Sequence, residues 1–204
     1  MLQTCSLPAL AFAALALAGC ASPDAGHDHG PTDGAKAPTM GMMGGRMGGM
    51  GGGMMRGRMA VASLTPTQGT DVRGLVVFHQ MDGQLMVHAR ISGLKPNGEH
   101  GFHVHETGSC ASADGTSAGG HFNPDGKPHG PPTAVHHTGD LPALKADANG
   151  VADQRFTVTG PTVIDGPASV VGRSVIVHAL PDDYATQPTG NSGARIACGV
   201  IAAH

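Results

Sequence analysis

Histidines crowded into one stretch of this chain constrain its fold more than any other feature. The segment Gly101-Phe102-His103-Val104-His105 is typical of a strand, and because side chains alternate along a strand, His103 and His105 share a face. Two imidazoles on one face of a rigid element provide half of a copper or zinc site. More candidate ligands follow in a Gly/Pro-rich stretch and in a later apolar run: His121, His129, His137, Asp140 and His178. The fold must return these segments to the strand, and the Asp140 carboxylate favours zinc among them.

The composition favours turns and short strands. The chain has 204 residues with 33 glycines and 15 prolines, only 3% aromatic residues and no tryptophan, so the core must be built from Val, Ile, Leu and Ala. Charged residues make up 13% and the formal net charge is −3. Nucleic-acid binding needs a basic patch, so we expect no nucleic-acid partner.

Apolar runs punctuated by glycine predict an all-β domain. They lie at residues 61–64, 72–80, 84–92, 99–106, 151–159, 173–179 and 196–202. Asp82-Gly83, between two of these runs, is a hairpin signal. Residues 107–149 form a long irregular stretch that holds most of the histidines, and metal cross-links would order it. With no convincing helix, the pattern favours an antiparallel sandwich or barrel.

The N-terminal residues predict export and lipidation. Residues 7–17 are an alanine-rich apolar run too short to span a bilayer well. The letters LAGC at residues 17–20 are similar to a lipobox, so we expect residues 1–19 to be a signal peptide and Cys20 to be acylated. Residue 21 is not the aspartate of an inner-membrane retention signal, so we expect a lipid-anchored protein of the cell envelope, on the outer membrane. The alternative is a plain signal peptide with a chance cysteine.

Residues 20–59 are predicted to be a disordered tether, because their glycine density leaves no apolar period. His27 and His29 provide possible ligands for Cu(II) or zinc. Thioethers are soft ligands for Cu(I), and the segment has many of them: Met40, Met42, Met43, Met47, Met50, Met54, Met55 and Met59. A flexible spacer whose methionines bind nothing is an equal alternative. The folded domain is then expected to span residues 60–204.

The cysteines agree with export. Cys5 lies in the segment predicted to be removed, and Cys20 is predicted to carry lipid. Cys110 and Cys198 remain, a pair suited to a disulfide in an oxidising compartment.

Five ordered motifs carry a resemblance to a known family. They are GFHVHE at 101–106, GGHFNP at 119–124, HTGDL at 137–141, VHALPDD at 177–183 and GARIACGVI at 193–201. Together they resemble the copper/zinc superoxide dismutases from about residue 60 onward. The position of Cys110 and the lipobox look like the bacterial periplasmic branch. The resemblance implies an eight-stranded antiparallel Greek-key barrel or sandwich with long metal-binding loops.

The resemblance also implies roles for individual residues. Copper would be bound by His103, His105, His121 and His178. Zinc would be bound by His121, His129, His137 and Asp140, with His121 bridging the two metals. His136 competes with His137 for the zinc role, and the family's spacing to Asp140 favours His137.

Three further residues acquire roles from the same resemblance. Asp182 would link a copper histidine to a zinc histidine, which fixes their tautomers. Arg195 would hydrogen-bond the small anion beside the open copper position. Cys198 lies close to Arg195 in sequence, so its bond to Cys110 would shape the site as well as stabilise the chain. His100 is expected to hydrogen-bond the backbone rather than bind metal, and His79 and His88 are expected to be surface residues. The terminal His204 is uninformative.

The implied reaction is the dismutation of superoxide, with Arg195 and His121 as catalytic residues and superoxide as the partner. Residues 183–188 contain no lysine, unlike many relatives, which leaves Lys127 and Arg195 as the nearest basic side chains for attracting the anion. A non-enzymatic copper-binding protein on the same barrel is the alternative, and a copper-only dismutase is a third possibility. The chain is expected to be a monomer or a homodimer.

Overall fold

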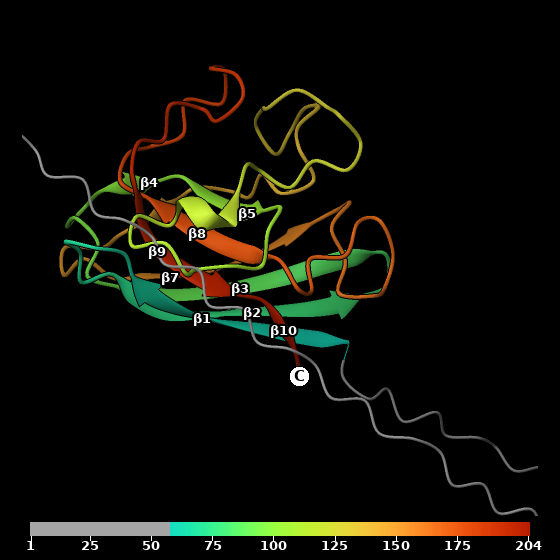
Figure 1. Cartoon of the computed structure of the whole chain (residues 1–204), viewed down its shortest axis with the longest axis horizontal. Helices are drawn as coiled ribbons and strands as arrows, with labels where there is room; N and C mark the ends of the chain where they lie inside the picture. The colour runs from blue at the N-terminus through green and yellow to red at the C-terminus, as the bar shows by residue number, and fades with distance from the viewer. Residues whose placement is uncertain (1–57) are drawn as a thin grey trace, which may run out of the picture. The chain divides into compact units, whose positions relative to one another are not determined.

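The computed structural model of the chain describes residues 58–204 (Figure 1). The predictions made for the signal segment, Cys20, His27, His29 and the methionines from Met40 to Met55 therefore lie outside the described residues. Within residues 58–204 no helix is long and apolar enough to cross a membrane.

Strands make up nearly all the regular structure of residues 58–204. They are β1 (Met59–Pro66), β2 (Arg73–Met81), β3 (Gln84–Ser92), β4 (Glu99–His100), β5 (Phe102–His105), β6 (Leu144–Lys145), β7 (Ala152–Val158), β8 (Ser174–His178), β9 (Arg195–Val200) and β10 (Ala202–Ala203). One short 3-10 helix, η1 (Thr116–Ala118), interrupts the long stretch between β5 and β6. β1 begins one residue before the boundary expected from the sequence.

The strands form an antiparallel sheet that curls back on itself. Its order is β5-β8-β9-β1-β2-β3-β7, with β10 also paired to β1, which makes eight strands as predicted. β1 joins the two halves, because its first six residues pair with β2 while Thr65 and Pro66 pair with β9. β4 and β6 pair separately. The predicted all-β, antiparallel class is confirmed.

The core lies between the two halves of the sheet (Figure 1). In β1, β2 and β3 alternate residues are buried, so that Ala60, Phe78 and Val87 face inward while their neighbours face outward. In β5 all four residues are buried. Phe102 and Val104 belong to the apolar core, so His103 and His105 must project to the opposite side, into the loops.

The hairpin predicted at Asp82-Gly83 is present. Met81 pairs with Gln84 across a two-residue turn, and Gly83 has a φ of 72°, a conformation that glycine adopts without strain.

Two strands predicted as continuous are broken. The run at residues 99–106 divides at Gly101, because β4 pairs with β6 whereas β5 pairs with β8. The run at residues 196–202 divides at Ile201, whose side chain is buried between β9 and β10. The division at Gly101 arises from a change of pairing partner, which local apolar pattern does not encode. At Ile201 the chain keeps β1 as a partner on both sides but leaves β8.

The predicted disulfide between Cys110 and Cys198 is confirmed. It packs with Ala118 and Ile176 in a small cluster of its own, apart from the main core. The bond connects the loop after β5 to the middle of β9, so it fixes part of the irregular stretch against the sheet.

Replacing both cysteines with serine should lower the free energy of unfolding by about 4–5 kcal/mol, the chain-entropy value for a loop of this length. The cross-linked residues are 88 positions apart, so the unfolded chain gains much freedom when the bond is lost. Urea unfolding of the Cys110→Ser/Cys198→Ser chain would measure the change. Reductant should bring the unsubstituted protein to the same stability, and a persistent difference would show that the serines act through packing instead.

Candidate metal centre

Four buried histidines from three parts of the chain converge on one point. His103 and His105 come from β5, His178 ends β8 at a register shift, and His121 lies in the loop after η1. Each offers one ring nitrogen, and the four nitrogens lie within 4.8 Å of one another. Such a set encloses a space of the size that a transition-metal ion needs.

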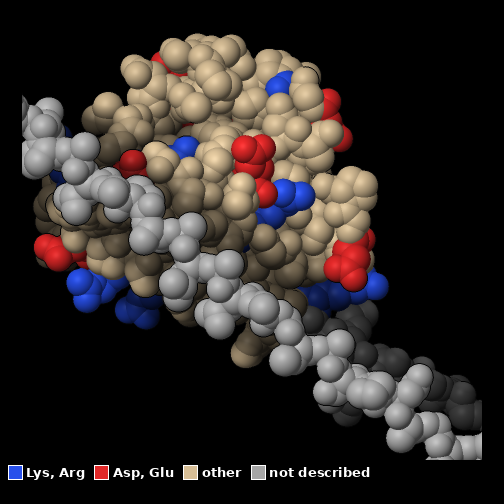
Figure 2. Space-filling view, in the orientation of Figure 1, with Lys and Arg blue, Asp and Glu red and all other residues tan. Residues whose placement is uncertain are grey.

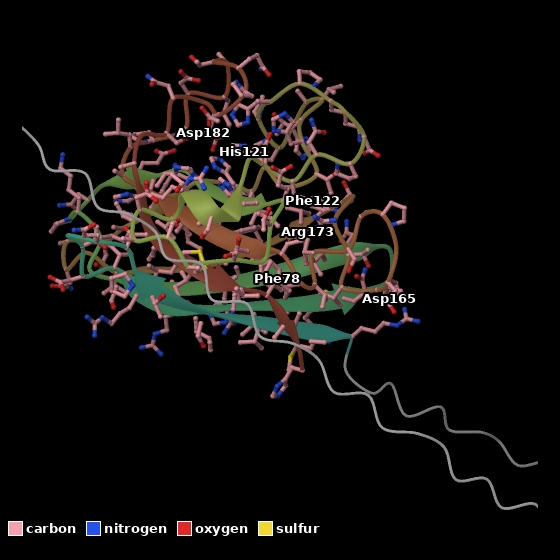
Figure 3. The ribbon with its side chains drawn as sticks, viewed as in Figure 1. Phe78, His121, Phe122, Asp165, Arg173 and Asp182 are labelled. Carbon is pink, nitrogen blue, oxygen red and sulfur yellow. A yellow bond between two sulfur atoms is a disulfide. The ribbon has the colours of Figure 1, made fainter. Side chains whose placement is uncertain are left out.

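A second cluster shares one residue with the first. His121, His129, His137 and Asp140 also bring one ligand atom each within 4.8 Å of one another, and all four are buried. Nδ1 of His121 lies 2.8 Å from Oδ1 of Asp140. His121 therefore faces the second cluster with Nδ1 and leaves Nε2 for the first. His121 and Asp182 are labelled among the loop side chains in Figure 3.

The clustered rings leave buried nitrogen atoms without hydrogen-bond partners. Within residues 58–204 these atoms are Nδ1 of His103, His129 and His137, and Nε2 of His105, His121 and His178. Buried polar groups are almost always paired, because an unpaired one costs about 1–3 kcal/mol. A cation in each cluster would satisfy all six nitrogens, so the donor set fits two metal ions.

The opposite nitrogens of the first cluster are anchored by acceptors. Nδ1 of His105 lies 3.0 Å from the Gly119 carbonyl, and Nδ1 of His178 lies 3.2 Å from the Gly193 carbonyl. An N–H held in this way fixes the tautomer, so the lone pair of the other nitrogen points into the cluster. Sequence analysis missed both carbonyls, because a backbone acceptor carries no side-chain signal.

Asp182 connects the two clusters from outside. One carboxylate oxygen lies 2.6 Å from Nε2 of His103, and the other lies 2.9 Å from Nε2 of His129. Gly190, with φ of 63°, packs against this contact, and a Cβ at that position would collide with both the carboxylate and the His129 ring. Gly190 therefore helps to position Asp182, and the sequence motifs did not indicate this role.

Asp140 lies at the centre of the second cluster. Its carboxylate lies 2.9 Å from Nδ1 of His129 and 3.3 Å from Nδ1 of His137. Nδ1 of His129 makes no hydrogen bond of good geometry at that distance. In this arrangement the Asp140 carboxylate and Nδ1 of His129 and His137 could bind the same cation. The backbone N–H of His137 donates to Oδ2 of Asp140 at 3.0 Å, which orients the carboxylate.

Backbone hydrogen bonds tie the histidine-bearing loop to β5. The Val104 N–H donates to the Gly139 carbonyl, and the Phe122 N–H donates to the Val104 carbonyl, both at 2.8 Å. The guanidinium of Arg173 lies 3.6 Å above the Phe122 ring, and Figure 3 shows the two side chains together.

Gln187 makes two hydrogen bonds of 2.8 Å to the backbone of His129. Residues 183–188, which contain no lysine, thus have a structural role: they fix the backbone of His129, a residue of the second cluster.

Burial keeps three histidines of the first cluster neutral, namely His103, His105 and His178. It lowers the pKa of His103 to about 4 and that of His178 to about 3, and it takes the pKa of His105 well below its usual range. At neutral pH these rings carry free lone pairs. Burial would also lower the pKa of His129, but the carboxylates of Asp140 and Asp182 outweigh it and raise that pKa to about 9. Metal entry at His129 must therefore displace a proton.

Arg195 begins β9 and is held by the loop that the disulfide fixes. Its guanidinium donates to the Gly115 and Gly119 carbonyls, each at 2.7 Å. The Gly119 carbonyl also faces His105, so the arginine and a cluster histidine share one acceptor. Arg195 lines a surface cavity of about 370 Å³ together with Thr67, Gln68, Asp114, Thr116, Gly193 and Ala194.

The remaining histidines lie outside both clusters. His136 is partly exposed and approaches the Ala134 carbonyl, so His137 is the one that joins the second cluster. Nδ1 of His100 lies 2.8 Å from the His178 carbonyl, in keeping with its expected backbone bond. His79 is exposed, and His88 lies 2.8 Å from Asp153.

In the metal-free protein, the free energy of unfolding should fall as the pH drops from about 6.5 toward 4. The pKa of His103 is about 4 when folded and 6.5 when unfolded, so the unfolded chain binds more protons in this window. His105 and His178 shift in the same direction. His129 acts oppositely, and its stabilisation is lost only as the pH rises toward 9.

Urea unfolding after chelation, at pH 7, 6 and 5, should show a loss on the order of a few kcal/mol. His103→Gln should reduce the slope, whereas His79→Gln, at an exposed position, should leave it unchanged. A stability independent of pH across this range would contradict the burial of neutral rings.

Comparisons with known proteins agree on one family. The family described as copper/zinc superoxide dismutase (SODC) matches residues 72–201. "Superoxide dismutase [Cu-Zn] 2" of Brassica juncea is 44% identical over 150 residues, which cover 69% of this chain and 95% of that protein.

Two solved structures are similar to the chain as well. The clock protein EA4 matches with a TM-score of 0.65 and 39% identity, over 72% of this chain and 96% of its own. A double mutant of a SOD-like protein from Bacillus subtilis matches with a TM-score of 0.60 and 38% identity, over 68% and 94%.

Proposed function

This chain belongs to the copper/zinc superoxide dismutase family, and we propose that it converts superoxide to oxygen and hydrogen peroxide at the two clusters joined by His121. The family uses copper and zinc. We assign copper to the cluster that contains only histidines: His103, His105, His121 and His178. Zinc is assigned to the cluster that contains a carboxylate: His121, His129, His137 and Asp140.

Donor chemistry supports this division. Zinc in structural sites takes a closed tetrahedral shell of nitrogen, sulfur and carboxylate ligands, and the Asp140 cluster supplies four buried ligands of that kind. Imidazole alone suits copper, and the all-histidine cluster has Arg195 nearby, bonded to the same Gly119 carbonyl as His105. Arg195 also lines a surface cavity, which agrees with the need of a redox metal for a side open to its substrate.

The single observation that carries the proposal is the position of His121. Its Nδ1 contacts Asp140 in one cluster, while its buried Nε2 has no hydrogen-bond partner and faces the other. One ring would thereby be able to hold a cation on each side. A purely structural zinc protein would have no use for the first cluster, and a simple copper carrier would have no use for the second.

The residues of the chain divide the work of the reaction. Copper, when bound, supplies the one-electron change that oxidises one superoxide and reduces the next. Arg195 binds and orients the anion through its guanidinium. Nε2 of His121 takes up one proton and passes it to the reduced substrate, and water supplies the second proton of hydrogen peroxide, while the second cluster holds the ring in place from its Nδ1 side.

Attraction of the anion falls chiefly to Arg195. Lys127, the other nearby basic residue in sequence, lies 2.8 Å from Asp125, which offsets its charge. Asp114 lies in the same surface cavity as Arg195 and opposes an incoming anion. On the face shown in Figure 2, side chains of both signs are dispersed and do not gather into one basic patch. We therefore expect a modest dependence of rate on ionic strength.

The non-enzymatic alternative is a copper-binding protein on the same fold. One similar structure is described only as SOD-like, so fold alone does not separate the two functions. The complete second cluster and the bonded Arg195 favour the enzyme, and the complete second cluster also weighs against a copper-only dismutase.

Arg195→Ala should lower dismutase activity about 10- to 100-fold at full metal loading, because a charged hydrogen bond contributes roughly 1.5–3 kcal/mol. Arg195→Lys should lose less, because it keeps the charge. Arg155→Ala, on the exposed side of β7, is the matched control and should retain full activity. Activity and metal content would be measured on each protein. A metal-loaded protein without dismutase activity, insensitive to Arg195, would favour the copper-binding alternative.

We further propose that the protein is an exported lipoprotein of the bacterial envelope, in the periplasmic branch of the family. The LAGC letters at 17–20 and the Cys110–Cys198 disulfide support an oxidising compartment. Cys20→Ser should release the protein from the membrane fraction without loss of activity. Cell fractionation and mass spectrometry of the N-terminal peptide would check this, and an unmodified Cys20 in the native protein would contradict the proposal.

A further inference from the structure

The direction of the Arg195 side chain depends on an irregularity at the start of β9. Val177 of β8 pairs with Ala197, whereas the next residue of β8, His178, pairs with Arg195. Ile196 is therefore an extra residue without a partner on β8, which makes this part of β9 a β-bulge. A bulge re-aims the side chains next to it, and bulges are frequent beside active sites.

The bulge determines which face of β9 carries the guanidinium. Ala197 belongs to the main apolar core, whereas Cys198 belongs to the separate disulfide cluster on the other face. Regular alternation would place Arg195 on the face of Ala197, toward the core. Instead Ile196 also packs against the main core, so two consecutive residues share that face. Arg195 is left on the face of Cys198, where its guanidinium donates to two carbonyls of the loop that the disulfide fixes.

Two threonine hydroxyls hold the backbone of this bulge. They come from residues 67–72, the loop that joins β1 to β2. Thr67 donates its hydroxyl to the Arg195 carbonyl at 2.7 Å, and Thr70 makes its shorter hydroxyl bond, also 2.7 Å, to the Ile196 carbonyl. Successive carbonyls of a regular strand point to opposite neighbours, so two that face one loop are a product of the bulge. The hydroxyls supply donors beyond the end of the pairing between β1 and β9.

The same loop also contacts the segment that accepts hydrogen bonds from the guanidinium. The Gln68 N–H donates to the Ala113 carbonyl at 2.7 Å. Thr67 is buried, and its methyl group and the stem of Arg195 lie on either side of Gly115: a Cβ at Gly115 would be 3.4 Å from Cγ2 of Thr67 and 3.2 Å from Cβ of Arg195. Thr67 therefore fixes both the strand that carries the arginine and the loop that orients it.

We propose that Thr67 and Thr70 are positioning residues for Arg195, so that the loop at residues 67–72 is part of the dismutase site. Their hydroxyls stabilise the bulge that turns the guanidinium away from the core. Neither residue lies in the histidine-bearing stretch or in one of the five motifs. The inference rests on the proposed role of Arg195 in binding the anion. If the threonines only stabilised the chain, their loss would lower the free energy of unfolding and leave anion binding unchanged.

Thr67→Val removes the hydroxyl and keeps the branched shape, so it should lower dismutase activity about 3- to 10-fold at matched metal content, the effect of losing one hydrogen bond. Thr67→Ser keeps the donor and should retain nearly full activity. Thr70→Val, at a half-buried position, should lower activity by a similar factor, and it provides the same test should Thr67→Val fail to fold. The double valine variant should approach the loss caused by Arg195→Ala.

Thr65→Val is the matched control. The Thr65 hydroxyl also donates to a carbonyl of β9, that of Cys198, but this residue pairs regularly and lies outside the bulge. The substitution should therefore leave activity unchanged. A loss from Thr67→Ser as large as that from Thr67→Val would show that the methyl packing matters and the hydroxyl does not, which would overturn the proposal. Equal activities of Thr65→Val and Thr67→Val would overturn it as well.

Azide affinity provides a second measurement that does not depend on turnover. Azide, a small anion, is titrated into the copper- and zinc-loaded protein and followed by the visible absorption of Cu(II). Thr67→Val should weaken azide binding about threefold or more. In an Arg195→Ala background the same substitution should have no further effect on azide affinity or activity, because no guanidinium is left to position.

The double-variant result separates positioning from general stability. A further loss in the Arg195→Ala background, equal to that in the unsubstituted background, would contradict a role through Arg195. A protein that dismutes superoxide normally with valine at 67 and 70 would overturn the inference and leave the proposed function standing. A protein that binds azide through Arg195 and the two threonines, yet dismutes no superoxide, would overturn the proposed function and leave the positioning role standing.

Discussion

The burial of neutral imidazoles on one side of β5 is the constraint on which the rest of the structure depends. The other side of the strand is covered by apolar residues of the core, which need no partner. The imidazole side is covered by loops rich in glycine and proline. Six ring nitrogens are left unpaired there, at a cost that only a cation or another polar group can remove. Metal binding and the ordering of the loops are therefore the same event in energetic terms.

Two carboxylates make this arrangement possible. Asp140 lies among the rings of one cluster, while Asp182 contacts one ring from each cluster through the ring nitrogen that points away from that cluster. Interactions with the surrounding histidines keep the pKa of both carboxyl groups below the usual range despite burial. Two negative charges would thus balance part of the charge that two divalent ions would bring into the interior.

Much of this could be predicted from sequence, because alternation in β5 and the spacing of the five motifs are local patterns. His103 and His105 had to share a face once the strand was recognised. The division at Gly101 and the register shift at His178 could not be predicted, since both depend on which distant strand becomes the partner. The roles of the Gly119 and Gly193 carbonyls could not be predicted for a related reason. Every residue has a carbonyl, and only the fold determines which one contacts a histidine of the cluster.

Gly190 shows how the tolerance of this sequence to change is distributed. It binds nothing and carries no functional group, yet a side chain there would push Asp182 away from histidines of both clusters. Gly83 has a similar backbone conformation, and a Cβ at that turn would meet nothing. Two glycines that look alike in sequence thus differ in what their loss would cost: one substitution strains a turn, whereas the other disturbs both metal sites at once. For these two glycines, tolerance to substitution depends on how close the position lies to a buried carboxylate, and not on the type of residue found there.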